Sequence, residues 1–285
     1  MFSLDRFVTL GFFRPLARLG LYRPEQGVPI LMYHSISAAD EPGVSPYYRL
    51  NTSPRRFRQQ MQWLREAGWR IVPVEEALGA AAGGRRVAAL TFDDGYRDFL
   101  TAAWPILAEF GYPATVYLPT GRVDEGGEFR GKPLLNWKEV RWLADQGIDF
   151  GSHTVHHVKL GEVTPEEAMW ELVESRRRLE DELGRPVKGF SLPYAFPEGN
   201  PGVCNDLMAA VQAAGYRYLL TTRLGRHRVE ETVWRVRRLP CNDSDDRSLL
   251  LAKLAGLYDW LYPLQRFVKR VRRREKTARP TGRGD

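Results

Sequence analysis

The chain has 285 residues, two cysteines and five histidines, with a formal net charge of +7. This length accommodates one α/β domain with short additions and does not require two domains. The cysteines, Cys204 and Cys241, have no metal-type spacing and give no support for a disulfide framework. The whole charge excess lies in residues 266–285, which carry nine Lys or Arg and two acids. The preceding residues are neutral, so the main domain is not expected to bind polyanions.

Residues 1–27 form an apolar, aromatic-rich extension that Arg6, Arg14 and Arg18 interrupt. The segment is too broken for a membrane span. It also lacks the basic start, continuous apolar core and small-residue cleavage site of a signal peptide. We therefore expect a cytoplasmic protein without a signal peptide, peripheral to the inner membrane.

Strand-like runs alternate with helical patterns between residues 28 and 245. The predicted strands lie near Ile30, Ile71, Leu90, Val116, Phe150, Phe190 and Leu219. The predicted helices cover residues 54–67, 96–110, 137–146, 165–183 and 203–214. The polar, glycine-rich residues 121–132 are predicted to form a loop beside the functional site that could contact substrate. This alternation is typical of a parallel sheet or barrel.

Two polar motifs follow two of these strands. Asp93 and Asp94 end the apolar run of residues 87–92, and His153 and His157 follow a short strand. In α/β folds, ligands bind at the carboxyl ends of parallel strands. One carboxylate and two imidazoles suit a catalytic zinc-type site with an open position, and the second aspartate is then free to act as a base.

The histidine spacing adds a local prediction. His153 and His157 are four residues apart, so one helical turn would bring both imidazoles to the same side, with His156 pointing elsewhere. The alternatives are simple turn chemistry for residues 93–95 and a surface cluster for the histidines. Three of the five histidines fall beside one strand end, downstream of an acidic strand end, and this favours a metal-dependent hydrolase.

These motifs resemble those of the polysaccharide deacetylase (NodB-homology) family. Residues 91–95, Thr-Phe-Asp-Asp-Gly, and residues 153–157, His-Thr-Val-His-His, are similar to the family's first two motifs. The resemblance extends from Val28 to Pro240. It implies a distorted, incomplete (β/α) barrel of the α/β class and the hydrolytic removal of N-acetyl, less often O-acetyl, groups from carbohydrate.

Carried over by position, the resemblance implies that Asp94, His153 and His157 bind the metal and that Asp93 is the catalytic base. A bound divalent ion activates its water and polarises the acetyl carbonyl. Zinc is the expected ion, and cobalt, nickel or iron would fit the same ligands.

A third motif is similar to the family's Arg-x-Pro-Tyr-like motif at residues 191–194, Ser-Leu-Pro-Tyr. The resemblance implies that the Tyr194 backbone N–H stabilises the oxyanion, with Pro193 beside it in the substrate site. The alternative is a turn with a packed ring. Ser191 stands where many members have an arginine that orients the catalytic aspartate, so the orientation of Asp93 has no explanation in the sequence.

The general acid, like Ser191, departs from the family pattern. The usual late Leu-x-His motif is absent, and the late histidine His227 lies in a polar loop that predicts a solvated side chain. His34, however, closes the strand at residues 28–33. This resembles a permuted branch related to exopolysaccharide-modifying deacetylases, and it implies that His34 is the acid. The alternative is that His34 caps the strand within the barrel mouth.

The segment of residues 233–240 is loosely similar to a late family motif that lines the acetyl pocket. We assign Trp234 and Arg238 to substrate binding, with Arg238 holding a carboxylate in place. The alternative for a tryptophan in a barrel protein is the core.

Residues 246–285 are predicted to form a helical, basic extension. Pro263 can open a helix with an apolar face of Leu264, Phe267, Val268 and Val271, surrounded by Lys and Arg. A basic amphipathic helix of this kind is attracted to an anionic membrane surface. The alternatives are a solvated helix and a nucleic-acid patch, but no nucleic-acid recognition fold accompanies it and we expect no nucleic-acid partner.

The expected organisation is an extension over residues 1–27, a deacetylase domain over residues 28–245 and a basic extension over residues 246–285. The expected function is metal-dependent N-deacetylation of an acetylated glycan: a polysaccharide, an oligosaccharide or a lipid-linked glycan. Two alternatives remain. One is a hydrolase of a non-sugar amide or O-acetyl ester, and the other is a catalytically decayed glycan-binding protein.

Overall fold

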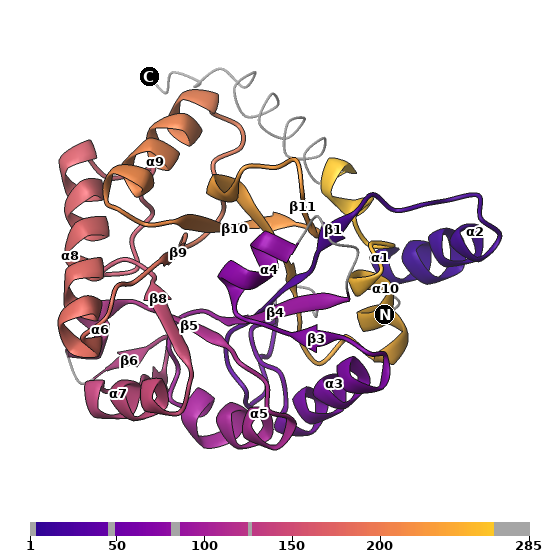
Figure 1. The fold of residues 1–285 in the computed structure, drawn as a ribbon, viewed down its shortest axis with the longest axis horizontal. Helices are drawn as coiled ribbons and strands as arrows, with labels where there is room; N and C mark the ends of the chain where they lie inside the picture. The colour runs from indigo at the N-terminus through magenta and orange to yellow at the C-terminus, as the bar shows by residue number, and fades with distance from the viewer. Residues whose placement is uncertain (1–3, 45–48, 81–85, 125–126, 265–285) are drawn as a thin grey trace, which may run out of the picture.

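The computed structural model describes residues 4–44, 49–80, 86–124 and 127–264. Seven parallel strands form a closed ring in which β4 pairs with β2 (Figure 1). In ring order they are β2 (Ile30–Tyr33), β12 (Val236–Pro240), β10 (Tyr218–Leu224), β9 (Gly189–Ser191), β8 (Asp149–Ser152), β5 (Thr115–Leu118) and β4 (Val87–Phe92). The predicted (β/α) barrel is confirmed, with seven strands where a complete barrel has eight.

Helices surround this ring (Figure 1). They are α3 (Pro54–Glu66), α5 (Trp104–Phe110) after the π-helix η4 (Phe99–Ala103), α7 (Trp137–Asp145), α8 (Pro165–Leu183) and α9 (Pro201–Ala213). These match the five predicted helices to within a few residues at their ends. The helix α4 (Val74–Ala80), which was not predicted, packs Val74 and Ala77 against Val28 and Ile30 at the amino-terminal end of the barrel.

Helix α8 shows how local signals set its ends. The side chain of Thr164 accepts a hydrogen bond from the backbone of Glu167, and the Glu167 side chain accepts one from the backbone of Thr164, which completes a capping box. Gly184 ends the helix at a φ of 62°. Residues 168, 171, 172, 175 and 179 make up its buried face, so Glu171 lies among core positions.

The smaller elements lie at the two ends of the barrel. They are β1 (Gly27–Val28), β3 (Arg70–Ile71), α6 (Thr120–Asp124), β6 (Glu128–Phe129), β7 (Lys132–Pro133), β11 (His227–Arg228) and the 3₁₀ helix η5 (Val233–Arg235). The expected loop at residues 121–132 therefore contains most of a short helix and a β-hairpin. His227 is 2% exposed in β11, which pairs with β1, so its predicted solvated position is wrong.

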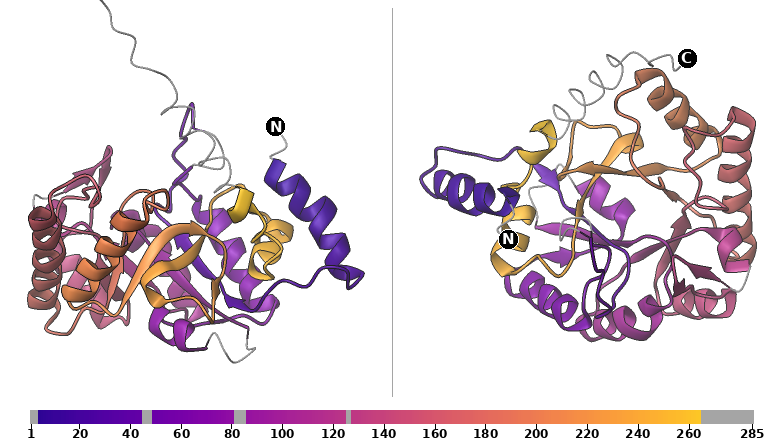
Figure 2. Two further views of the ribbon diagram at one scale, coloured as in Figure 1. Left: turned by 90° about the horizontal axis from the view of Figure 1, so that it is seen from above. Right: turned by 180° about the vertical axis from the view of Figure 1, so that it is seen from behind.

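The two terminal segments pack together beside the barrel. The helical run α1 (Leu4–Val8), η1 (Thr9–Phe13) and α2 (Arg14–Arg18) lies against α10 (Arg247–Leu254) and stands away from the ring (Figure 2). Among the described residues, every helix is too short or too polar to cross a bilayer. Most of the predicted basic helix, residues 265–285, lies outside the described residues.

Candidate active site

Three predicted ligands meet at the carboxyl ends of the strands. Asp94 follows β4 and His153 follows β8, while His157 lies four residues further along the same loop. The Asp94 Oδ1 atom is 3.5 Å from His153 Nε2 and 3.2 Å from His157 Nε2. One donor atom from each residue lies within 4.8 Å of the other two, and all three side chains are buried. This arrangement converges on a common point as a metal site requires.

The loop that carries the histidines is not a helical turn. Thr154 and His157 adopt left-handed conformations, with φ of 67° and 59°. The expected helix is therefore wrong, although both imidazoles reach the same side and His156 points away as predicted. Among the described residues, all those other than glycine with positive φ lie in or around the site: Asp94, Arg130, Thr154, His157 and Tyr194. Such conformations cost free energy and persist at functional sites, where surrounding contacts hold them.

The residues fit a divalent metal. Asp94 Oδ2 is buried without a hydrogen-bond partner among the described residues, as a carboxylate oxygen reserved for a ligand would be. His153 Nδ1 lies 2.7 Å from the carbonyl oxygen of Ser191 and must donate to it, which leaves Nε2 as the free lone pair facing Asp94. Burial alone would raise the pKa of Asp94, but the neighbouring His153 and His157 imidazoles hold that pKa well below the ordinary value.

Arg238 in β12 holds Asp93 in a bidentate ion pair. Its two terminal nitrogens lie 2.8 and 2.7 Å from the two carboxylate oxygens of Asp93. The Ser191 hydroxyl donates to Asp93 Oδ1 at 3.1 Å and accepts from Arg238 at 3.0 Å. Arg238 is therefore the arginine that the sequence lacked at position 191, supplied from a different strand.

The same contacts keep Asp93 ionised. Its side chain is 3% exposed and that of Arg238 is fully buried. Burial alone would raise the pKa of Asp93, but the Arg238 guanidinium outweighs it and leaves that pKa below its ordinary value. An ionised, oriented carboxylate beside the ligands is placed to accept a proton.

His34 lies on the neighbouring strand end. Tyr33 pairs with Phe92, so His34 and Asp93 leave adjacent parallel strands at the same level. Burial lowers the pKa of His34, and the charges of Asp94 and Asp93 act in the opposite direction. The strand register thus places His34 at the same mouth of the barrel as Asp93 and Asp94.

Glu171 of α8 supports the histidine loop, a role that the sequence reasoning missed. One of its carboxylate oxygens accepts from the backbone of Val155 at 2.7 Å and of His156 at 3.0 Å. The other lies 2.7 Å from His156 Nδ1. The available signal was an acid at a core position of an amphipathic helix, because a buried carboxylate needs partners.

We expect Glu171→Ala to weaken metal binding by about 10- to 100-fold, because support of a ligand loop is typically worth that much. The substitution leaves the Val155 and His156 amides without their acceptor. A chelator competition titration measures the affinity, and Glu166→Ala, on the exposed first turn of the same helix, is the control. Equal metal affinity in the two variants would contradict a supporting role for Glu171.

Two aromatic rings, those of Phe129 and Tyr194, lie with nearby cations on one side of the predicted ligands, and we call them the aromatic wall. The rings of Phe129 and Tyr194 each lie 4.8 Å from the His157 ring. The Arg130 guanidinium lies 5.0 Å from the Phe129 ring and 6.0 Å from the Tyr194 ring, and Lys159 Nζ is 5.4 Å from Tyr194. Tyr194 is 40% exposed, so one side of the wall is open to a ligand. No signal in the polar loop at residues 121–132 predicted Phe129 or Arg130 here.

Of the three residues assigned to substrate binding, the structure places only Pro193 beside open space. Pro193 and Tyr194 line a cavity of about 430 Å³ that Lys159 and Leu207 also border. Arg238 is buried and holds the Asp93 carboxylate in place, as the sequence suggested. Trp234 lies in η5, where its half-buried ring packs against the hydrophobic core.

Comparisons with known proteins agree with this geometry. A family model described as polysaccharide deacetylase matches residues 80–219, which include Asp93, Asp94, both histidine ligands and the Ser191–Tyr194 motif. The Bacillus subtilis protein YxkH, described as a polysaccharide deacetylase, is 26% identical over 74% of this chain and 70% of its own length.

Two further relatives extend the comparison. The poly-β-1,6-N-acetyl-D-glucosamine N-deacetylase of Escherichia coli (strain K12) is 32% identical over 46% of this chain, which corresponds to 21% of that enzyme. The solved structure of a Streptococcus pyogenes deacetylase in complex with acetate superposes with a TM-score of 0.69 at 25% identity, covering 81% of this chain and 99% of that one. The chain therefore belongs to the polysaccharide deacetylase family, and it is a carbohydrate deacetylase.

Proposed function

We propose that this protein is a metal-dependent N-deacetylase that hydrolyses acetamido groups of a glycan. The observation that carries the proposal is the convergence of Asp94, His153 and His157 beside an Asp93 carboxylate that Arg238 keeps ionised and oriented. Asp94, His153 and His157 would hold the ion, for which zinc is our first choice. When bound, the ion would lower the pKa of a water molecule to about 7 and polarise the acetyl carbonyl.

The chain's own groups would carry the proton steps. Asp93 takes a proton from the attacking water, because its carboxylate is ionised and fixed beside the ligands. The Tyr194 backbone N–H donates to the oxyanion that develops on the acetyl carbonyl. His34 donates a proton to the departing amine, since its strand end borders those of Asp93 and Asp94.

The substrate assignment rests on a relative and on the wall beside the ligands. The E. coli relative is named as an N-deacetylase of poly-β-1,6-N-acetyl-D-glucosamine, and we propose N-acetylglucosamine as the sugar for this chain as well. Tyr194 offers an exposed ring against which the apolar face of a sugar can stack. The cavity next to Pro193 can take a neighbouring unit.

Acetate release tests this proposal. The purified protein is incubated with β-1,6- and β-1,4-linked N-acetylglucosamine oligomers and with an O-acetylated sugar, with and without prior chelation and with metal added back. We expect acetate from at least one series, loss on chelation and recovery with zinc. Acetate release that survives complete metal removal would contradict the mechanism. Release only from O-acetylated sugars would move the assignment to an esterase.

We expect His34→Gln to lower kcat for the acetamido substrate by about 10²- to 10⁴-fold, the usual contribution of a general acid. An aryl acetate with a nitrophenolate leaving group needs no such proton, so its hydrolysis should be nearly unchanged. Steady-state assays on both substrates measure the difference. If both activities fell equally, His34 would not be the acid.

A further inference from the structure

The N-terminal helix exposes apolar side chains on its outward face. The residues Leu4–Arg18 form one helical run that projects from the barrel (Figures 1 and 2). Three large apolar side chains of this helix, Leu4, Phe7 and Phe12, and two directly after it, Leu19 and Leu21, are between 57% and 73% exposed. Apolar groups gathered on one exposed element mark an interaction site rather than ordinary surface.

The inward face of the same helix is attached by polar contacts. These are the Tyr258 hydroxyl to Asp5 at 2.5 Å, Arg6 to Asp246 at 2.6 Å and Trp260 Nε1 to the Thr9 hydroxyl at 3.0 Å. Thr9 is fully buried. An ordinary surface helix buries its apolar side and exposes its polar side. In this helix Asp5, Arg6 and Thr9 bond to the body of the protein. Leu4, Phe7 and Phe12 stay largely exposed in the part of the chain that the structure describes, so these three side chains are available to a partner.

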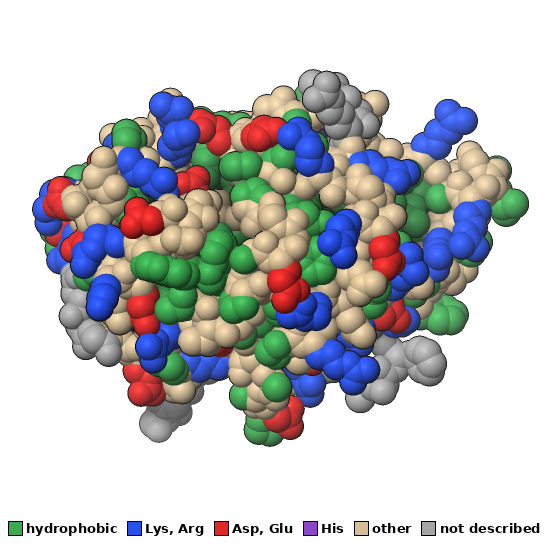
Figure 3. Space-filling view, turned by 60° about the horizontal axis from the view of Figure 1, so that its bottom comes forward, with side chains coloured by type: hydrophobic (Ala, Val, Ile, Leu, Met, Phe, Trp, Pro, Cys, Tyr) green, Lys and Arg blue, Asp and Glu red, His purple; other side chains and the backbone are tan. Residues whose placement is uncertain are grey.

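The charges on this segment favour an anionic partner. Residues 1–23 contain four arginines and one acid, and that acid, Asp5, is bonded to Tyr258. Arg14, Arg18 and Arg23 accompany the exposed apolar residues. Basic and hydrophobic side chains share the lobe at the right of Figure 3, where this helix projects.

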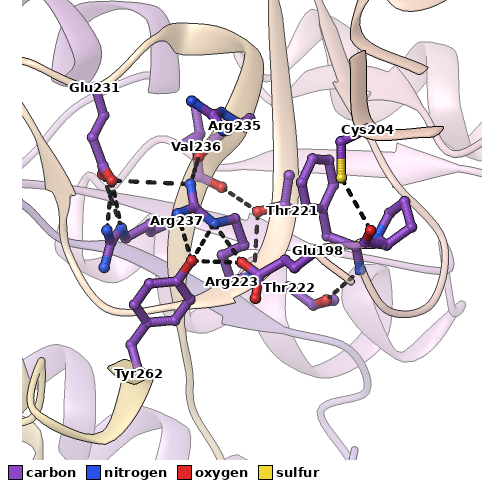
Figure 4. A network of polar contacts seen from close by, with 12 residues as sticks. Glu198, Cys204, Thr221, Thr222, Arg223, Glu231, Arg235, Val236, Arg237 and Tyr262 are labelled. Atoms are coloured by element: carbon purple, nitrogen blue, oxygen red, sulfur yellow. Dashed lines mark hydrogen bonds and ion pairs between the residues drawn. The ribbon is translucent and has the colours of Figure 1, made fainter. Parts of the chain in front are cut away.

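The basic C-terminal segment begins near the same place. Tyr262 is held between the guanidinium groups of Arg223 and Arg237, at 5.0 and 4.2 Å from its ring, and its hydroxyl donates to Glu198 at 2.6 Å (Figure 4). Two residues earlier, Trp260 stacks on Phe13 of the N-terminal helix, with ring centroids 5.5 Å apart. Residues 266–285 follow with nine Lys or Arg and two acids.

We propose that the N-terminal helix docks in the interface of an anionic lipid bilayer, with Phe7 and Phe12 inserted among the acyl chains. Arg14, Arg18 and Arg23 then contact lipid phosphates. A second copy of the chain is a poorer occupant. A stable protein interface uses about 20–30 residues on each side, whereas the exposed large apolar side chains here are three on the helix and two directly after it.

Vesicle co-sedimentation of the full chain tests the proposal. The vesicles contain either phosphatidylcholine alone or equal parts of phosphatidylcholine and phosphatidylglycerol. We expect binding to the anionic vesicles, and a partition constant lower by about tenfold or more in the double variant Phe7→Ser/Phe12→Ser. Val173→Ser, which removes an apolar side chain of similar exposure on α8, should bind like the wild type.

A second readout guards against a folding defect. Acetate release from a soluble oligosaccharide should be the same in all variants, and backbone hydrogen exchange of residues 4–21 should slow only with anionic vesicles. Absence of binding by the wild type, or equal binding by the double variant, would overturn the proposal. Concentration-dependent dimerisation that the double variant abolishes, without vesicle binding, would assign the face to self-association instead.

Discussion

Arg238→Met is expected to lower kcat by about 100-fold or more. Asp93 loses both the positive charge that keeps it ionised and the two parallel guanidinium hydrogen bonds that orient it. The same substitution leaves a buried carboxylate without its partner. It should therefore reduce the free energy of unfolding by about 3–5 kcal/mol, the usual cost of breaking a buried ion pair from one side. Acetate-release kinetics and urea unfolding measure the two effects.

Two controls separate orientation from stability. Arg237→Met removes the neighbouring arginine of β12, which pairs with Glu231 at 2.5 Å, and it should destabilise the protein without the fall in kcat. Arg238→Lys keeps the positive charge but cannot make the bidentate contact with Asp93, and its kcat should lie between those of Arg238→Met and the wild type. A similar kcat in Arg238→Met and Arg237→Met would mean that Arg238 serves the fold alone.

Asp93→Asn is expected to lower kcat by about 10²- to 10⁴-fold while leaving metal binding intact, because an amide cannot accept the proton. Unlike His34→Gln, it should impair hydrolysis of an aryl acetate as much as that of the acetamido substrate. The attack of water needs a base whatever the leaving group. Steady-state rates on both substrates, with metal content measured on the same samples, provide the test.

A matched substitution controls for the loss of a buried carboxylate. Asp245→Asn removes one that pairs with Lys253 at 2.6 Å, outside the ligand cluster, and should leave kcat unchanged. The double variant Asp93→Asn/Arg238→Met should be no slower than Asp93→Asn, because both residues serve one step. Additive losses would contradict the role of Arg238 as a positioning residue for Asp93.

The sequence predicted most of the fold because its signals are local. The apolar run of residues 87–92 predicts a strand, and the periodic pattern of residues 165–183 predicts a helix, without help from the rest of the chain. The prediction was weaker where the conformation depends on tertiary contacts. Residues 153–157 were expected to form a helical turn, but Glu171 binds the loop backbone and stabilises two left-handed residues instead.

The same limit applies to the site. Asp93, Asp94, His153 and His157 were recognisable because each pair follows a strand at the end where parallel strands bind ligands. The sequence suggested that Arg238 holds a carboxylate but not that this carboxylate is Asp93, since the two residues lie 145 positions apart and only closure of the ring brings them together. Phe129 and Arg130 reach the site through a hairpin, whereas the polar sequence predicted an irregular loop beside the site.

Metal content per chain tests the central claim most directly. Wild type, Asp93→Asn and Asp94→Ala are each purified, reconstituted with zinc, freed of excess ion and analysed by mass spectrometry of the metal. We predict one ion per chain in wild type and Asp93→Asn, and a large loss in Asp94→Ala, because only Asp94 supplies a ligand oxygen. Absence of metal in the reconstituted wild type, or full retention in Asp94→Ala, would contradict the assignment of Asp94, His153 and His157 as the metal site.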